Sequence, residues 1–137
     1  MIDMKNRQAQ LQQMVEDMLN EAAIQGASAA EAAVNFDIGL STSVRLGEVE
    51  TIEHTRDQGM GVSVYFGHRK GSASTSDFRP EAILDTVRAA CNIAKFTTED
   101  PYSGLADAAR MAGEQPDLDL YHPWEMEVEE ADRKSVV

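Results

Sequence analysis

The chain has 137 residues, 42% of them hydrophobic and 26% charged, which is the size and composition of one globular domain able to bury a core. Its net charge of -12, from 24 acidic and 12 basic residues, argues against binding of a polyanion such as DNA. Cys91 is the only cysteine, so no internal disulfide can form. The N-terminus is polar and no apolar run reaches roughly 18 residues, which predicts a cytoplasmic protein without a membrane span.

Residues 4–25 carry a helical pattern, because apolar side chains recur every three or four positions. This apolar stripe consists of Leu11, Met14, Val15, Met18, Leu19 and Ala22. Asp3 is placed to cap the start, and Gly26 is placed to end the helix with a left-handed residue. A methionine-rich stripe can form an adaptable binding groove, but these methionines alternate with leucine and valine, which favours core packing.

Residues 34–76 alternate apolar and polar side chains, which predicts strands with one buried face. Four strands are expected, at 34–46, 49–56, 60–66 and 72–76. The turns between them are expected at Gly47-Glu48, at Asp57-Gln58-Gly59 and across Gly67 to Gly71. The last strand, SASTS, is small and polar, so it is interpreted as an edge or as a place where another backbone comes close.

A second helix is expected from Pro80 to about Ala94 or Phe96. Its apolar stripe consists of Ile83, Leu84, Val87, Ala90, Cys91 and Ala94. Glu81 and Asp85 are placed to meet the positive end of the helix dipole. Arg79 is a poor capping residue, so Asp77 is expected to take that role.

The pattern as a whole predicts an α+β fold, with an antiparallel four-stranded meander and two amphipathic helices packed on one of its faces, in the order αββββα. This domain is expected to span residues 1–100. Residues 101–137 are interpreted as a linker and the start of a following region, truncated because an apolar stub follows EEADRKS. Within this irregular extension, Leu105 to Met111 is expected as a short helix. Pro123 begins another helical pattern, with Trp124, Val128 and Ala131 on one side.

The histidines and the cysteine give no recognisable catalytic set. The sequence contains no HExxH, HExxxH or CxxC spacing, so a zinc site has no local support. The three histidines, His54, His68 and His122, are therefore interpreted as surface or loop residues. Cys91 falls on the inner stripe of its helix and is interpreted as a small hydrophobe. The alternative, a nucleophile, would need exposure and a basic neighbour.

Three other groups of residues have a functional and a structural interpretation. The serines at 41–43 and 72–76 lack a GxSxG elbow and are interpreted as strand and turn residues. Gly59-Met60-Gly61 precedes a strand rather than a helix, so a turn is favoured over a phosphate loop. The acidic segment Glu48, Glu50, Glu53 and Asp57 could bind a metal or perform acid–base chemistry. A strand would place Glu53 opposite Glu48 and Glu50, which favours a solvated edge.

The segments RLGEVE, DQGMGVSVYFG, KGSASTSD and TTEDPYSGLAD resemble the N-terminal domain of the PmbA/TldD family, on the PmbA (TldE) side rather than the TldD side. The likeness runs from the first helix to about Asp107. It implies a cytoplasmic metallopeptidase of two paired chains, linked to processing of peptide antibiotic precursors and degradation of an antitoxin. The older name, modulator of DNA gyrase, derives from that biology rather than from DNA binding. TldD-type chains carry a zinc-binding HExxxH motif, and PmbA-type chains lack it and serve as the partner subunit.

No motif-bearing catalytic position of the family falls within these residues, so no catalytic, cofactor-binding or metal residue is predicted here. Zinc is expected on the TldD-type partner, and a peptide is expected as the substrate, with no nucleic acid or membrane as a partner. Two alternatives remain: a standalone peptide-binding module that uses a free strand edge, and an autonomous hydrolase that uses Cys91 or a serine.

Overall fold

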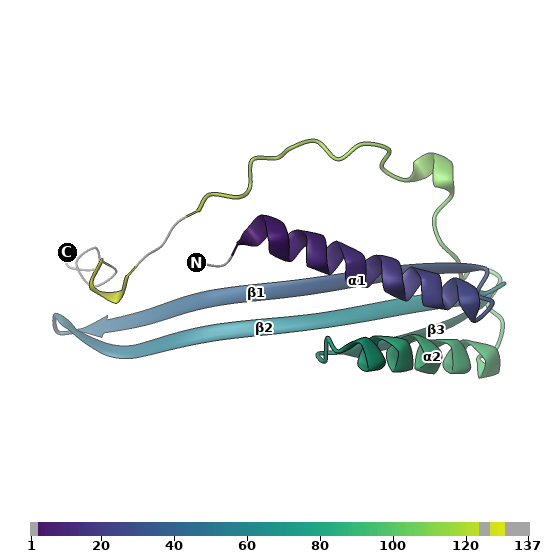
Figure 1. Cartoon of the computed structure of the whole chain (residues 1–137), viewed down its shortest axis with the longest axis horizontal. Coiled ribbons are helices and arrows are strands. Elements are labelled where there is room, and N and C mark those ends of the chain that lie inside the picture. The colour runs from purple at the N-terminus through teal and green to yellow at the C-terminus, as the bar shows by residue number, and fades with distance from the viewer. Residues whose placement is uncertain (1–2, 124–126, 131–137) are drawn as a thin grey trace. The chain divides into compact units, whose positions relative to one another are not determined.

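The computed structural model describes residues 3–123 and 127–130 (Figure 1). Its elements are the helix α1 (Met4–Ile24), the strands β1 (Ala29–Arg45), β2 (Glu48–Phe66) and β3 (Arg69–Thr75), the helix α2 (Pro80–Phe96) and the short 3₁₀ helix η1 (Ala108–Arg110). The strands form one antiparallel sheet in the order β1-β2-β3. The predicted α+β class is therefore confirmed.

The described residues form three strands, not the four that were predicted, so the order is αβββα. The predicted turn at Asp57-Gln58-Gly59 is wrong, because these residues continue β2 without a break. Gly59 serves another purpose. A Cβ at this position would lie 3.0 Å from Oδ1 of Asn35, so the glycine permits close approach of a neighbouring side chain rather than a reversal of the chain.

The turn between β1 and β2 lies one residue earlier than predicted. Its two central residues are Leu46 (φ 55°) and Gly47 (φ 81°), and Glu48 already begins β2. Two positive φ values in a two-residue connection are the signature of a type I′ turn. Glycine adopts this backbone freely, whereas the left-handed region costs an L-residue such as leucine roughly 1–2 kcal/mol.

The turn between β2 and β3 is shorter than predicted. Gly67 (φ 64°) and His68 make the connection, and Arg69 already begins β3. Gly71 was assigned to the turn but lies inside the strand, under α2. A Cβ on Gly71 would collide with the carbonyl oxygen of Ala90 and lie 2.5 Å from the nitrogen of Ala94. The close backbone approach suggested for the small residues of this strand is therefore made by α2.

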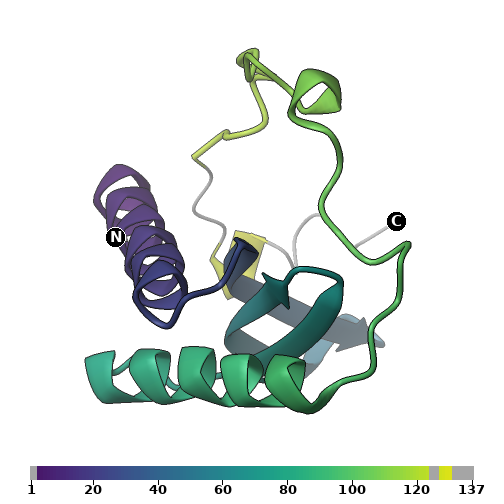
Figure 2. The same cartoon turned by 90° about the vertical axis from the view of Figure 1, so that its right-hand side faces the viewer.

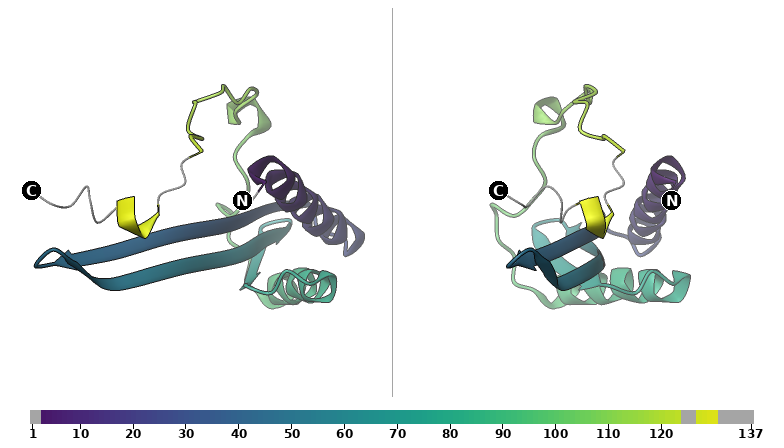
Figure 3. Two further views of the ribbon diagram at one scale, coloured as in Figure 1. Left: turned by 60° about the vertical axis from the view of Figure 1, so that its left-hand side comes forward. Right: turned by 90° about the vertical axis from the view of Figure 1, so that its left-hand side faces the viewer.

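The chain divides into two compact units, which are described separately. The packed unit consists of Met1–Phe36 and Gln58–Asp107, and the second unit consists of Asp37–Asp57 and Ala108–Val137. We call Asp37–Asp57, which contains the turn at Leu46-Gly47, the hairpin segment. Figure 3 shows β1 and β2 side by side up to this turn. The predicted boundary near residue 100 stays a prediction.

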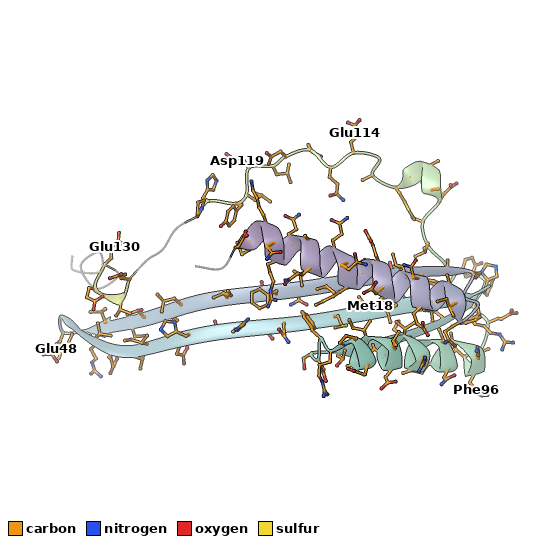
Figure 4. The ribbon with its side chains drawn as sticks, viewed as in Figure 1. Met18, Glu48, Phe96, Glu114, Asp119 and Glu130 are labelled. Atoms are coloured by element: carbon orange, nitrogen blue, oxygen red, sulfur yellow. The ribbon has the colours of Figure 1, made fainter. Side chains whose placement is uncertain are left out.

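The core of the packed unit joins one face of the sheet to both helices (Figure 2). Met18 points from α1 into this core, and Val64 and Val87 are fully buried with it (Figure 4). The cluster consists of Met18, Ala22, Met60, Val62, Val64, Ile83, Val87, Ala90, Cys91 and Ala94. The methionine-rich stripe of α1 therefore takes part in the core, as its mixture with leucine and valine predicts.

The ends of the helices follow the predicted capping residues. Oδ1 of Asp3 accepts a hydrogen bond from the Asn6 amide (3.3 Å), and Gly26 follows α1 with φ 91°. Pro80 is the first residue of α2, and Arg79 at its N-cap makes no side-chain capping bond. Oδ1 of Asp77 instead accepts a hydrogen bond from the Arg79 amide (3.0 Å), so Asp77 stabilises the entry to α2.

After α2 the described chain is largely irregular. The helix expected from Leu105 to Met111 is reduced to η1. Residues 128–130 form one helical turn, whereas Trp124 and Ala131 of the pattern after Pro123 lie outside the described residues. No helix in the part of the chain that the structure describes is long and apolar enough to cross a membrane.

Candidate functional site

The face of the sheet opposite the helices carries small and polar side chains in the packed unit. Along β2, Met60, Val62 and Val64 point into the core, so Gly61, Ser63 and Tyr65 lie on the other face. Antiparallel pairing sets these three opposite Ser74, Ser72 and Lys70 of β3. Gly61, Ser63, Ser72 and Ser74 therefore give this part of the face short side chains.

Hydrogen bonds within this face link the strands in pairs. Oγ of Ser63 and Oγ of Ser72 lie 2.8 Å apart, and the Tyr65 hydroxyl donates to Oε1 of Glu31 over 3.4 Å. In the described part of the chain, neither serine has an imidazole or carboxylate as a hydrogen-bond partner. Since a serine nucleophile needs an adjacent base, this pair has the geometry of a structural cross-strand contact.

A shallow depression of about 450 Å³ lies over this face. It is lined by Glu31, Ala32, Ala33, Gly61, Val62, Ser63, Ser72, Ala73 and Ser74. The short side chains leave room for another backbone to approach the sheet, but they supply no set of acid, base and nucleophile.

A groove of about 520 Å³ lies between α1 and the start of α2. Met14, Ile83 and Leu84 form part of its apolar lining, together with Phe78 from the connection before α2. The sequence indicated a methionine-bearing helix face at Met14. It gave no sign that Phe78 would close the groove, because this contact depends on how α2 packs against α1.

Cys91 lies in the core rather than in any cavity. Its side chain is 1% exposed, and burial raises the pKa of its thiol. A buried thiol with a raised pKa is the opposite of an activated nucleophile, which needs a thiolate in contact with solvent. The interpretation of Cys91 as a small core hydrophobe is confirmed, and the hydrolase that would use it has no structural support.

The three histidines do not converge on one site. His54 lies in the hairpin segment and is exposed, whereas His122 lies in the exposed irregular stretch after η1. His68 occupies the β2–β3 turn, where its Nδ1 lies 3.1 Å from the carbonyl oxygen of Ser103. Among residues 3–123 and 127–130, no three His, Cys, Asp or Glu side chains are grouped so that they could hold a metal ion. A catalytic zinc therefore does not fit the described residues.

The acidic segment is exposed, as predicted for a solvated edge. Glu48, Glu50, Glu53 and Asp57 all lie on the surface of β2, and Glu48 stands beside the turn (Figure 4). Arg45 contacts Glu50 at 3.6 Å between Nη1 and Oε1. Such an exposed pair contributes little to stability.

Gly59-Met60-Gly61 forms neither a phosphate loop nor the turn that was predicted. The three residues lie within β2, and Met60 is buried in the core. The serines at 41 and 43 likewise lie within β1. Neither segment therefore forms the loop or the elbow that its catalytic interpretation needs.

Comparison with known proteins was made by sequence and by structure. Residues 30–94 match the family model described as PmbA/TldA metallopeptidase domain 1. The chain is 49% identical over 102 residues to metalloprotease PmbA of Escherichia coli O157:H7, and 46% identical over 128 residues to the metalloprotease PmbA homolog of Haemophilus influenzae. These matches cover 74% and 93% of this chain, but only 23% and 28% of the two relatives.

Two solved structures share the fold. A protein from Bacteroides thetaiotaomicron, described as a modulator of DNA gyrase, superposes with a TM-score of 0.69 at 22% identity, over 80% of this chain and 25% of that one. TldE of Thermococcus kodakarensis superposes with a TM-score of 0.61 at 18% identity, over 81% of this chain and 25% of that one. The chain therefore spans about a quarter of the length of the proteins that it matches.

Proposed function

Because the chain belongs to the PmbA/TldD family, we propose that it acts as the N-terminal, non-catalytic domain of a PmbA (TldE)-type subunit in a TldD/TldE-like metallopeptidase complex for peptide processing and proteolysis. The observation that carries this proposal is the match of residues 30–94 to the first domain of that metallopeptidase family. The close sequence relationship to metalloproteases named PmbA supports placement on the PmbA side.

The arrangement of side chains supports a role in shaping the complex. The described residues offer no metal-binding trio, so the zinc of the proposed complex would be held by residues elsewhere, on the TldD-type partner. What the domain does offer is a small-residue sheet face and exposed strand edges, which suit contact with a peptide or a second chain.

The purified chain tests this proposal when it is assayed alone and with a TldD-type subunit. Metal analysis should find far less than one zinc ion per chain, and the chain alone should not cleave unfolded peptides. Mixing it with the TldD-type subunit should give a complex of the two chains in analytical ultracentrifugation. Stoichiometric zinc on the isolated chain, or the absence of a complex, would refute the proposal.

A standalone peptide-binding module is the second candidate function. Among the described strands, β1 and β3 each pair on one side only, so the outer edge of each has no strand partner, which is the position where an extended peptide could add. If this candidate holds, the isolated chain binds an unstructured peptide, and the amides of one edge strand become protected from hydrogen exchange. The same peptide would leave those amides unprotected if the chain works only within a complex.

A further inference from the structure

The turn of the hairpin segment combines two unfavourable features in one residue. Leu46 has a left-handed backbone, which disfavours a bulky L-residue, and its side chain is 96% exposed to solvent. Asparagine or glycine would satisfy the same turn without strain and without an exposed aliphatic side chain. Within the described chain, the leucine gains no contact that offsets either feature. Backbone strain that packing does not explain is characteristic of functional sites.

Further apolar side chains are exposed on both strands of the hairpin segment. Ile38 is 54% exposed on β1, and Ile52 is 48% exposed on β2. Leu40 and Val49 are also exposed. Single exposed apolar residues are ordinary, but several of them on the strands that lead to one turn make this segment a candidate for contact with another protein.

The charges beside the turn indicate the chemistry of the covering surface. Glu48 is exposed next to the turn, and in the described part of the chain it has no cationic side chain within 4.0 Å, whereas Glu50 contacts Arg45. The hairpin segment has five acidic residues and two basic ones, from Asp37 to Asp57. A complementary surface would therefore place lysine or arginine around an apolar centre.

We infer that the turn of the hairpin segment inserts Leu46 into an apolar socket rimmed by lysine and arginine side chains on the partner subunit. The identity of the partner rests on the proposed function, whereas the socket's chemistry follows from Leu46 and the Glu48 carboxylate beside it. In this arrangement Leu46 is the central anchor, and Glu48, which begins β2 next to the turn, orients the approach of the two chains.

The substitution Leu46→Asn separates binding from folding. It creates the Asn-Gly pair that type I′ turns prefer, so the midpoint of thermal unfolding of the chain should stay the same or rise. Affinity for the TldD-type subunit, measured by isothermal titration calorimetry, should nevertheless fall at least about tenfold, as for loss of an interface anchor. Ile93→Asn is the matched control, since Ile93 is an aliphatic residue with 50% exposure on α2 and lies outside the hairpin segment. It should leave affinity unchanged.

Charge reversal tests the rim of the socket. The variant Glu48→Lys should slow association with the TldD-type subunit, and the difference from the unmodified chain should shrink as salt is added. Glu16→Lys on α1 changes an exposed carboxylate outside the hairpin segment and should have little effect on the association rate.

The outcomes distinguish the inference from the proposed function. If the unmodified chain binds the TldD-type subunit and Leu46→Asn binds equally well, the inference is overturned and the proposed function stands. If the unmodified chain fails to bind, the proposed function falls and the inference falls with it. If Leu46→Asn abolishes self-association in ultracentrifugation but leaves subunit binding intact, the socket lies on a second copy of this chain, and the assignment to the partner subunit is overturned.

Discussion

Residues 58–66 of β2 bury alternate side chains under two helices, whereas residues 48–57 of the same strand are exposed throughout. Both halves belong to one continuous strand, and both contain β-branched residues such as Val64 and Ile52. The difference shows that alternation predicts the strand but does not decide which part of it becomes core. Burial depends on where the helices lie, and this is a property of tertiary packing.

The two regions of the sheet also differ in the interactions that stabilise them. In the packed unit, burial of apolar side chains stabilises the fold, by on the order of 25 cal/mol per Å² of apolar area removed from water. In the hairpin segment, the strands pair through their backbones up to the turn at Leu46-Gly47, and most of the side chains are exposed. An isolated two-stranded hairpin is marginally stable at best, so continuity with the strands of the packed unit is needed to hold this one.

The largest loss of stability should come from adding a side chain where β3 and α2 approach each other most closely. Gly71→Ala would place a Cβ against the backbone of Ala90 and Ala94 and force α2 away from the sheet, which should lower the free energy of unfolding by about 3 kcal/mol. Urea denaturation measures this change. Gly113→Ala is the control, because a Cβ there meets nothing within 4 Å. A loss of under about 0.5 kcal/mol for Gly71→Ala would show that α2 can shift freely.

A matched pair of valine substitutions compares the two halves of β2 directly. Val64→Ala removes a fully buried side chain from the core and should lower the free energy of unfolding by about 2 kcal/mol, from lost burial and the cavity that remains. Val49→Ala changes an exposed side chain in the hairpin segment and should stay within about 0.5 kcal/mol. Equal losses at both positions would contradict the division of β2.

The smallest effect concerns the entry to α2. Hydrogen bonds from the Arg79 side chain and amide lower the pKa of Asp77 from 3.8 to about 2. Since this pKa is lower in the folded chain, its contribution to stability is present above about pH 4 and is lost as the pH falls toward 2. The contribution is small and sensitive to salt, because the Arg79 side chain is largely in solvent and the Asp77 side chain is partly exposed.

Asp77→Asn tests this contribution. The variant should be slightly less stable than the unmodified chain at neutral pH, and the difference should vanish near pH 2. Titration of the Asp77 carboxyl by NMR should give a midpoint near 2. A midpoint near 3.8 would show that the contact with Arg79 is not maintained in solution.

The helices could be predicted almost to the residue because their signals are local. Asp3, Gly26 and Pro80 each act within one helical turn of their own position, and the apolar stripes repeat along a single segment. The number of strands could not be predicted in the same way. Gly59 has the composition of a turn residue, but its role depends on Asn35, which lies on another strand.

The candidate surfaces were less accessible to sequence reasoning than the fold. The contact between Ser63 and Ser72 follows from the register of β2 and β3. The sequence analysis placed the start of β3 too late, so it could not predict this contact. Leu46 was assigned to an ordinary strand end, because sequence rules place asparagine or glycine in the first position of a type I′ turn. Leu46 could be recognised as unusual only from its positive φ, which the backbone of the structure provides.

The hairpin segment is an insertion between two parts of the chain that pack together, Met1–Phe36 and Gln58–Asp107. Adding two residues to each of its strands would preserve the alternation of faces and lengthen it by about 7 Å. Even doubling the length of a connection costs only about 0.6 kcal/mol of closure entropy in a flexible chain. The length of the hairpin segment can therefore change while the sequence of the core stays unchanged.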